Sequence, residues 1–175
     1  MIGHWPWRYD PDIYARIMVS KSPHTVAILR DPAKRALSSY FYNHKRLSGD
    51  TSRASIKDFA DFLEYDYDED FYCRWFCYPA SPDHPDYDNA KTNLMKNIST
   101  VGIVEEYQKF LDICNYRFEL NSKNTIINKG DKHFGVSDLP DNVRVLLYKK
   151  TEKDRYLYDI AKARFFNDYQ NYLDS

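Results

Sequence analysis

Short apolar runs alternate with amphipathic stretches along the chain. Residues 24–29 (His-Thr-Val-Ala-Ile-Leu) and 101–104 (Val-Gly-Ile-Val) are apolar runs with β-branched members, which predicts two buried strands. Apolar positions then recur at helical spacing over residues 31–45 and 105–115, directly after each run. Short strands that alternate with helices predict an α/β domain with a short parallel sheet flanked by helices.

Capping residues mark where further helices begin. Ser55 is followed three positions later by Asp58, and Thr151 by Asp154, which is the capping-box pattern. These pairs predict one helix after Ser55 and a last helix after Thr151. Helices are also predicted over residues 88–97 and 139–149.

Two stretches of biased composition lie between these helices. Residues 58–70 hold seven acidic and no basic side chains, and we expect them to form a solvated face far from any anionic ligand. Residues 71–78 are mostly aromatic. Packing in the core is their expected role, and stacking against sugar rings is the alternative.

The composition is that of an ordinary folded domain. The 175 residues are 43% hydrophobic and 17% aromatic, which is enough to build the core of one domain. The 25 basic and 26 acidic side chains give a net charge of -1, which argues against a protein that binds nucleic acid through phosphate contacts. No apolar run approaches the roughly 20 residues that span a bilayer, and no signal peptide is visible. We therefore expect no transmembrane segment and favour the cytoplasm.

The chain has three cysteines, Cys73, Cys77 and Cys114, which are few for its length and favour a reducing compartment. A Cys73–Cys77 or a Cys77–Cys114 bridge remains an alternative. Cys73, Cys77 and His84 match no familiar spacing of zinc ligands. We therefore expect cysteines that pack in the core, and no metal.

Glycine is scarce. The five glycines lie at least five positions apart, so the chain has no G-x-G-x-x-G phosphate-binding loop. Residues 130–135 have the G-x-x-x-x-G spacing of a P-loop, but Val136 and Ser137 stand where that loop needs Lys-Ser or Lys-Thr. Because the lysine that contacts the phosphates is missing, these residues are not a Walker A loop.

The end of the first predicted strand carries the most informative polar residues. Arg30 follows the strand, and Asp31 and Pro32 are a favoured N-cap and first residue for the next helix. Ligands of open α/β sheets bind outside the carboxyl ends of strands, where a helix N-terminus offers N–H groups to an anion. Arg30, Lys34 and Ser38 are spaced by four, which predicts a face with two cations and a hydroxyl for phosphate or sulfate.

A purely structural interpretation of the same residues stays open. In it, Arg30 forms an ion pair with Asp31 or with Glu105. Lys34 and Arg35 then belong to a solvated helix face. The spacing alone favours neither interpretation.

Residues 29–40, Leu-Arg-Asp-Pro-Ala-Lys-Arg-Ala-Leu-Ser-Ser-Tyr, resemble the 3′-phosphate-binding motif of sulfotransferases, L-R-[DE]-P-x-x-R-x-x-S-x-[YW]. The resemblance is closest to the carbohydrate sulfotransferases (heparan- and galactosyl-type) and their bacterial relatives, which use 3′-phosphoadenosine-5′-phosphosulfate as donor. It implies that Arg30 and Ser38 bind the 3′-phosphate of that donor. It also implies a P-loop-like three-layer fold.

Two further segments resemble the same family, in the same order along the chain. Residues 101–107 are similar to its V-G-[LI]-x-E-x-[FY] segment, where a strand ends and a helix begins. Residues 154–161 are similar to its D-x-x-L-Y-x-x-A element in the final helix. The resemblance therefore extends over residues 29–161.

Shorter similarities add three candidate residues. Gly3-His4-Trp5-Pro6 resembles the family's G-H-x-x element, which implies that His4 is the base that takes the proton of the acceptor hydroxyl. Residues 128–130 (Asn-Lys-Gly) resemble a basic loop that folds over the donor in some sulfotransferases. Lys129 and Lys132 are then donor-binding candidates, or alternatively solvated lysines of a flexible loop.

The chain departs from the family at the 5′ end of the donor. Sulfotransferases bind the 5′-phosphosulfate with a P-K-x-[GA]-[TS]-[TS]-[TSL] segment ahead of the G-H element, and no such segment occurs here. We therefore expect residues 1–175 to form a single, N-terminally truncated domain, without the first strand and its loop. An apolar edge of the sheet is then left exposed. The Golgi lumen is the expected compartment if the chain is a fragment of a eukaryotic enzyme.

The resemblance implies a sulfotransferase that moves a sulfuryl group from 3′-phosphoadenosine-5′-phosphosulfate to a carbohydrate hydroxyl, without a metal. The expected partners are this small-molecule donor and a saccharide acceptor. The alternative is a non-catalytic nucleotide-binding or interaction module derived from such an enzyme. A nucleotide-kinase-like protein is a weaker third candidate, since the Walker lysine is absent.

Overall fold

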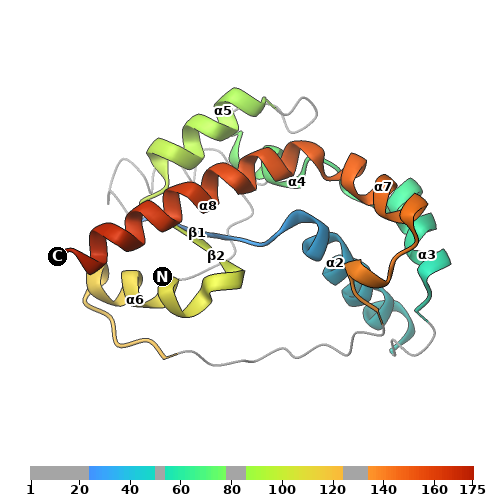
Figure 1. Cartoon of the computed structure of the whole chain (residues 1–175), viewed down its shortest axis with the longest axis horizontal. Helices are drawn as coiled ribbons and strands as arrows, with labels where there is room; N and C mark the ends of the chain where they lie inside the picture. The colour runs from blue at the N-terminus through green and yellow to red at the C-terminus, as the bar shows by residue number, and fades with distance from the viewer. Residues whose placement is uncertain (1–23, 50–53, 78–85, 124–133) are drawn as a thin grey trace.

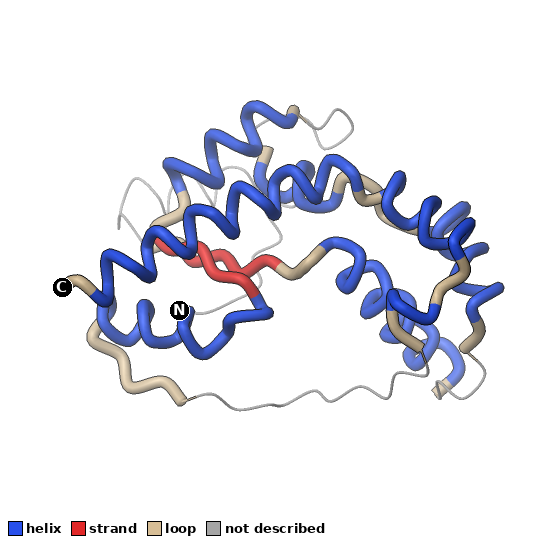
Figure 2. Tube along the Cα trace, viewed as in Figure 1, coloured by secondary structure: helices blue, strands red, loops and turns tan. Residues whose placement is uncertain are grey.

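The computed structural model describes residues 24–49, 54–77, 86–123 and 134–175. Helices make up most of this part of the chain, and a small pair of strands lies near its middle (Figure 2). Two π-helical segments (Phe62–Asp66 and Asn93–Asn97) and two short 3₁₀ turns (Val104–Glu106 and Val136–Asp138) extend or connect the main elements. The strands and α-helices, in order, are β1 (Val26–Leu29), α2 (Pro32–Ser48), α3 (Ile56–Asp61), α4 (Phe71–Phe76), α5 (Tyr87–Thr92), β2 (Thr100–Ile103), α6 (Tyr107–Phe118), α7 (Asp141–Lys150) and α8 (Glu152–Leu173).

Strands β1 and β2 are parallel, so the predicted parallel sheet flanked by helices is confirmed. The register pairs Val26 with Thr100 and Leu29 with Ile103. Helix α8 runs across the strands, and α6 lies beside them next to the C-terminal end of α8 (Figure 1). The described residues therefore form an α/β structure in which helices far outweigh the sheet.

The buried apolar side chains form two clusters, which we call the sheet core and the helical core. The sheet core combines both strands with α4, α5, α6 and α8, and its largest fully buried members include Leu29, Leu94 and Phe165. The helical core combines α2, α3 and α7 around Tyr40, Phe59 and the other buried side chains of these helices. In Figure 1, α2, α3 and α7 gather at the end of the molecule away from α6.

The predicted start of α2 is confirmed in detail. The Asp31 side chain accepts a hydrogen bond from the Lys34 amide at 3.0 Å, and Pro32 is the first helical residue. The helix that was predicted after Ser55 is also present, because the Ser55 hydroxyl accepts from the Asp58 amide at 3.1 Å. Both caps follow from local chemistry, since a short polar side chain satisfies an amide that the first turn leaves free.

The predicted capping box at the start of α8 is wrong. The Thr151 hydroxyl donates back to the Leu147 carbonyl at 2.8 Å and makes no cap. Asp154 is buried and accepts hydrogen bonds from the amides of Tyr72 and Cys73, which lie 82 and 81 residues away in the sequence. A long-range contact has therefore replaced the local one.

The acidic stretch 58–70 is solvated as expected, since all of its acidic residues except Asp70 are exposed, but its end contacts other helices. Asp70 pairs with Lys153 at 2.8 Å and Glu69 pairs with Lys150 at 2.7 Å, so the end of this stretch is held against α7 and α8. The Asp68 carbonyl is 3.5 Å from Nη2 of Arg35 on α2. The end of the stretch thus lies beside α2, and printed contacts pair three of its seven carboxylates, those of Asp68, Glu69 and Asp70, with basic side chains.

One face of the sheet is covered over β2 only. Gly102 lies under the Phe110 ring of α6 so closely that a Cβ atom at this position would stand 2.1 Å from Cδ2 of that ring. The neighbouring β1 residues on this face, Val26 and Ile28, are 48% and 40% exposed. The prediction of a buried strand is therefore wrong for these two residues, and within β1 only Leu29 is fully buried.

Candidate functional site

The carboxyl ends of β1 and β2 lie side by side because the strands are parallel. Leu29 and Ile103 are paired as the last strand residues, and Asp31 and Glu105 follow them. Oε1 of Glu105 accepts a hydrogen bond from the Asp31 amide at 3.2 Å. This contact joins the residues that follow the two strands.

Helix α8 adds two side chains to the same place. The Tyr158 hydroxyl donates to Oε2 of Glu105 at 3.0 Å, and Nη1 of Arg155 lies 3.7 Å from Oδ2 of Asp31. Burial and the neighbouring Glu105 carboxylate raise the pKa of Tyr158, so this hydroxyl stays protonated and remains a donor. We call the group formed by Asp31, Lys34, Glu105, Arg155 and Tyr158 the strand-end cluster.

Arg30 lies at the edge of this cluster and is held by its backbone. The Arg30 amide donates to the Tyr72 hydroxyl at 2.8 Å, and that hydroxyl donates to the Arg30 carbonyl at 2.7 Å. The guanidinium is half-buried and has no ion pair with any residue of the described ranges. The structural interpretation, in which Arg30 pairs with Asp31 or Glu105, is therefore wrong for these residues. The cation near Glu105 is Lys34, at 3.8 Å.

The start of α2 offers fewer backbone donors than the sequence predicts. The Asp31 side chain already accepts from the Lys34 amide, and Pro32 has no N–H group. Among the described residues, the Ala33 amide is then the only first-turn donor ahead of Lys34, and Ala33 is buried. Any anion at this helix end would have to be bound mainly by side chains.

The side chains present suit that task. Lys34 and Ser38 are four residues apart on α2 and therefore share one face; the Lys34 side chain is 55% exposed and Ser38 is half-buried. Ser38 lies about 10 Å along the helix axis from Asp31. Arg30 precedes the N-cap Asp31 and lies outside α2, so the predicted helical face holds Lys34 and Ser38 but not Arg30. Counting Arg30, Lys34 and Arg155 against Asp31 and Glu105 leaves one net positive charge.

Neither Arg35 nor Asp154 was predicted from the sequence to belong to this region. The Arg35 side chain is only 15% exposed, so the solvated helix face of the structural interpretation is wrong for Arg35. Its guanidinium lies 3.9 Å from the Phe71 ring centroid, donates to the Tyr67 hydroxyl at 2.8 Å and stands 3.9 Å from Oδ2 of Asp154. Burial raises the pKa of Asp154 to about 6 even though Arg35 lowers it.

A signal for these two residues was present in the motifs themselves. Arg35 is the second arginine of the R-D-P-x-x-R pattern, and Asp154 opens the D-x-x-L-Y pattern. The structure places these two residues beside each other. The aromatic segment 71–78 gave no such signal for Tyr72.

The remaining candidates fall outside the described ranges. His4, Lys129 and Lys132 are among the residues that the structure does not describe, and so is His84. Within the described ranges, no three or more His, Cys, Asp or Glu side chains are grouped so that they could hold a metal ion. Cys73, Cys77 and Cys114 are buried free thiols.

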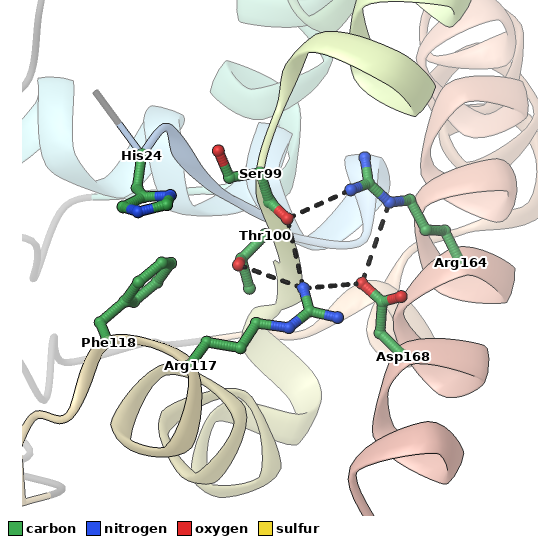
Figure 3. Close-up of a pocket in the computed structure, with 7 residues that line it drawn as sticks. All are labelled: His24, Ser99, Thr100, Arg117, Phe118, Arg164 and Asp168. Carbon is green, nitrogen blue, oxygen red and sulfur yellow. Dashed lines mark hydrogen bonds and ion pairs between the residues drawn. The ribbon is translucent and has the colours of Figure 1, made fainter. Parts of the chain in front are cut away.

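A second candidate site lies at the opposite ends of the strands (Figure 3). This pocket of about 380 Å³ is lined by His24, Ser99, Thr100, Arg117, Phe118, Arg164 and Asp168. Arg117 and Arg164 both contact Asp168 and donate to the Ser99 carbonyl, as the dashed lines in Figure 3 show. The His24 ring lies 5.0 Å from the Phe118 ring. Since the charged groups bind one another, they fasten α6 and α8 to the start of β2, and we interpret the pocket as structural.

Comparison with known proteins adds no relative. No protein-family model, no curated protein and no solved structure matches the chain. None of the described helices is both long enough and apolar enough to cross a membrane.

Proposed function

We propose that the chain is a sulfotransferase-like domain with a P-loop-like fold that binds 3′-phosphoadenosine-5′-phosphosulfate at the strand-end cluster. Arg30, Lys34 and Ser38 would hold the 3′-phosphate. The donor supplies the activated sulfuryl group, and a carbohydrate hydroxyl is the acceptor. His4 is the proposed base for that hydroxyl, on the resemblance alone.

One observation carries this proposal: the three segments that resemble the family meet at a single place. Glu105, from the second segment, binds both Asp31 of the first and Tyr158 of the third. Arg35 of the first segment lies beside Asp154 of the third. Segments that share a site in space are expected of a functional resemblance and not of three chance matches.

The residues present fit a phosphate group. Arg30, which has no ion pair in the described ranges, directly follows a parallel strand, and the exposed Lys34 lies in the first turn of the helix after it. Arg155 offsets the Asp31 carboxylate, which otherwise repels an anion. The pocket beyond the other strand ends has no such unpaired cation.

A binding module without transfer activity is the second candidate. It accounts equally well for Arg30, Lys34 and Ser38, because holding the 3′-phosphate requires no transfer step. This protein would bind the nucleotide and recognise a partner or a saccharide without sulfating it.

Titration with adenosine 3′,5′-bisphosphate, followed by calorimetry, tests the proposal. Saturable binding is expected, and Arg30→Ala should weaken it about tenfold or more, because a charged hydrogen-bonding partner of the phosphate is lost. Arg144→Ala is the matched control, since Arg144 is an α7 arginine that pairs with Asp141 away from the cluster. Binding that is absent, or equal in both variants, would rule out the donor site.

Sulfate transfer from labelled donor to a panel of saccharides then separates the two candidates. Transfer by the full chain supports the enzyme, and it should be lost in Arg30→Ala. Binding without transfer supports the module.

A further inference from the structure

Asp154 connects helix α8 to the start of α4. Oδ1 of its carboxylate accepts from the Tyr72 amide at 2.8 Å and from the Cys73 amide at 3.4 Å. These are amides of the first turn of α4, which lacks a cap of its own because Asp70 is left-handed (φ 55°) and its side chain makes no cap hydrogen bond. Asp154 thus supplies from another helix the acceptor that this turn needs.

Tyr72 carries this constraint to the strand end. Its backbone amide is bound to Asp154, and its hydroxyl both accepts from the Arg30 amide and donates to the Arg30 carbonyl. The side chain is buried, with 5% of its surface exposed, and a tyrosine has few rotamers. Burial raises the pKa of this hydroxyl, so it remains able to donate. Tyr72 is therefore fixed at both ends and spans the distance from Asp154 to Arg30.

We propose that Asp154 is a positioning residue for the strand-end site, which it acts on through Tyr72 by fixing the backbone of Arg30. The proposal rests on the proposed function for its ligand, but the connection from Asp154 to Arg30 does not require a ligand. Asp154 itself is buried, and among the described residues it makes no hydrogen bond or ion pair with a member of the strand-end cluster.

The surroundings of Asp154 make its charge adjustable. From α2, Arg35 faces it at 3.9 Å; from the segment before α4, Tyr67 and Asp70 face it; and from α4 it faces Tyr72 and Cys73. Asp70 is paired in turn with Lys153 of α8. Oδ2 of Asp154 is buried and has no hydrogen-bond partner among the described residues, and burial raises the pKa of Asp154 to about 6. Its hydrogen bonds to α4 are stronger when the carboxylate is charged, so they weaken when it is protonated.

Nuclear magnetic resonance of the ligand-free chain tests the connection. The Tyr72 amide should shift with pH around a midpoint of about 6, since it donates to the titrating carboxylate. The Arg30 amide should follow with the same midpoint, although it is bound to Tyr72 and not to Asp154. Both transitions should vanish in Asp154→Asn. The Arg30 transition should also vanish in Tyr72→Phe, which lacks the hydroxyl.

Binding of adenosine 3′,5′-bisphosphate tests the positioning role. At pH 7.5 each of Asp154→Asn and Tyr72→Phe should weaken binding about three- to tenfold. The double variant should bind the nucleotide as tightly as the single variant with the lower affinity. Asp159→Asn, an exposed aspartate on the same helix, is the matched control and should bind like the unchanged chain.

The outcomes separate this inference from the proposed function. An Arg30 amide that ignores the Asp154 transition, or losses that add in the double variant, would overturn the positioning role even if the nucleotide binds. An Arg30 amide that follows Asp154 in a chain with no nucleotide affinity would keep the connection and overturn the proposed ligand.

Discussion

The Tyr158 hydroxyl donates a hydrogen bond to Oε2 of Glu105 at 3.0 Å, and this contact links the last helix to the residue that follows β2. The other oxygen of the same carboxylate accepts from the Asp31 amide at 3.2 Å and lies 3.8 Å from Nζ of Lys34. A single side chain therefore joins β1, β2, α2 and α8.

Removal of this carboxylate should lower stability markedly. Glu105→Ala leaves the Asp31 amide and the hydroxyl of the buried Tyr158 without acceptors, and we expect a loss of about 2–3 kcal/mol in the free energy of unfolding. Glu106→Ala is the control, since Glu106 makes only an exposed ion pair with Lys109 and should cost less than about 1 kcal/mol. Urea denaturation of both variants measures the difference, and equal losses would contradict the role of Glu105.

Gly102 should not tolerate a side chain. In Gly102→Ala the new Cβ would stand 2.1 Å from Cδ2 of Phe110, so α6 must shift, at a cost of about 1–3 kcal/mol or more. Gly135→Ala is the comparison, because the nearest atom to its Cβ lies at 3.5 Å in ordinary contact. Thermal denaturation of both variants measures the effect, and the melting temperature should fall more in Gly102→Ala than in Gly135→Ala. Adding Phe110→Leu to Gly102→Ala should recover part of the loss.

The free energy of unfolding should change with pH because the Asp154 carboxyl titrates. Its pKa in the folded chain is raised to about 6 from a usual value of 3.8, so the folded state binds more protons than the unfolded state between these values. The contribution of Asp154 to stability therefore falls as pH rises from about 4 to about 6, by about 3 kcal/mol in all. Urea denaturation of the unchanged chain and of Asp154→Asn at pH 4, 5, 6 and 7 gives this slope as a difference. The free energy of unfolding of the unchanged chain minus that of Asp154→Asn should fall as pH rises. If this difference rises with pH, the raised pKa is contradicted.

The three cysteines should react slowly in the folded chain. All are buried free thiols, and burial raises the pKa of Cys73 to about 12 and that of Cys114 to about 11. Ellman's reagent at pH 8 should detect three thiols only after denaturation, without any reductant. Fewer than three would show that one of the bridges left open by the sequence has formed.

The strands and the start of α2 could be predicted because their signals are local. The β-branched runs, the Asp31 cap and the first-turn proline act over a few residues, and the structure has the sheet and the helix where they indicate. The alternation of strand and helix was also sufficient for the parallel pairing of β1 and β2.

Contacts between distant residues could not be predicted in the same way. Thr151 and Asp154 have the spacing of a local cap. Asp154 instead accepts hydrogen bonds from the amides of Tyr72 and Cys73 at the start of α4, which is distant in the sequence. The charge of Arg35 likewise favours a solvent-exposed side chain. Its burial depends on the Phe71 ring, which no local pattern connects with α2.

The division of the interior into two cores has a mechanical consequence. The sheet core and the helical core are separate apolar clusters, and polar contacts join them where α8 passes the start of α2, through Arg35 with Asp154 and Asp31 with Arg155. Salt screens the more exposed of these pairs, Asp31 with Arg155, and screens the buried Arg35–Asp154 pair much less. The strand end is thus where charge joins the two clusters, and rising ionic strength should weaken that junction at Asp31 before it affects Arg35 and Asp154.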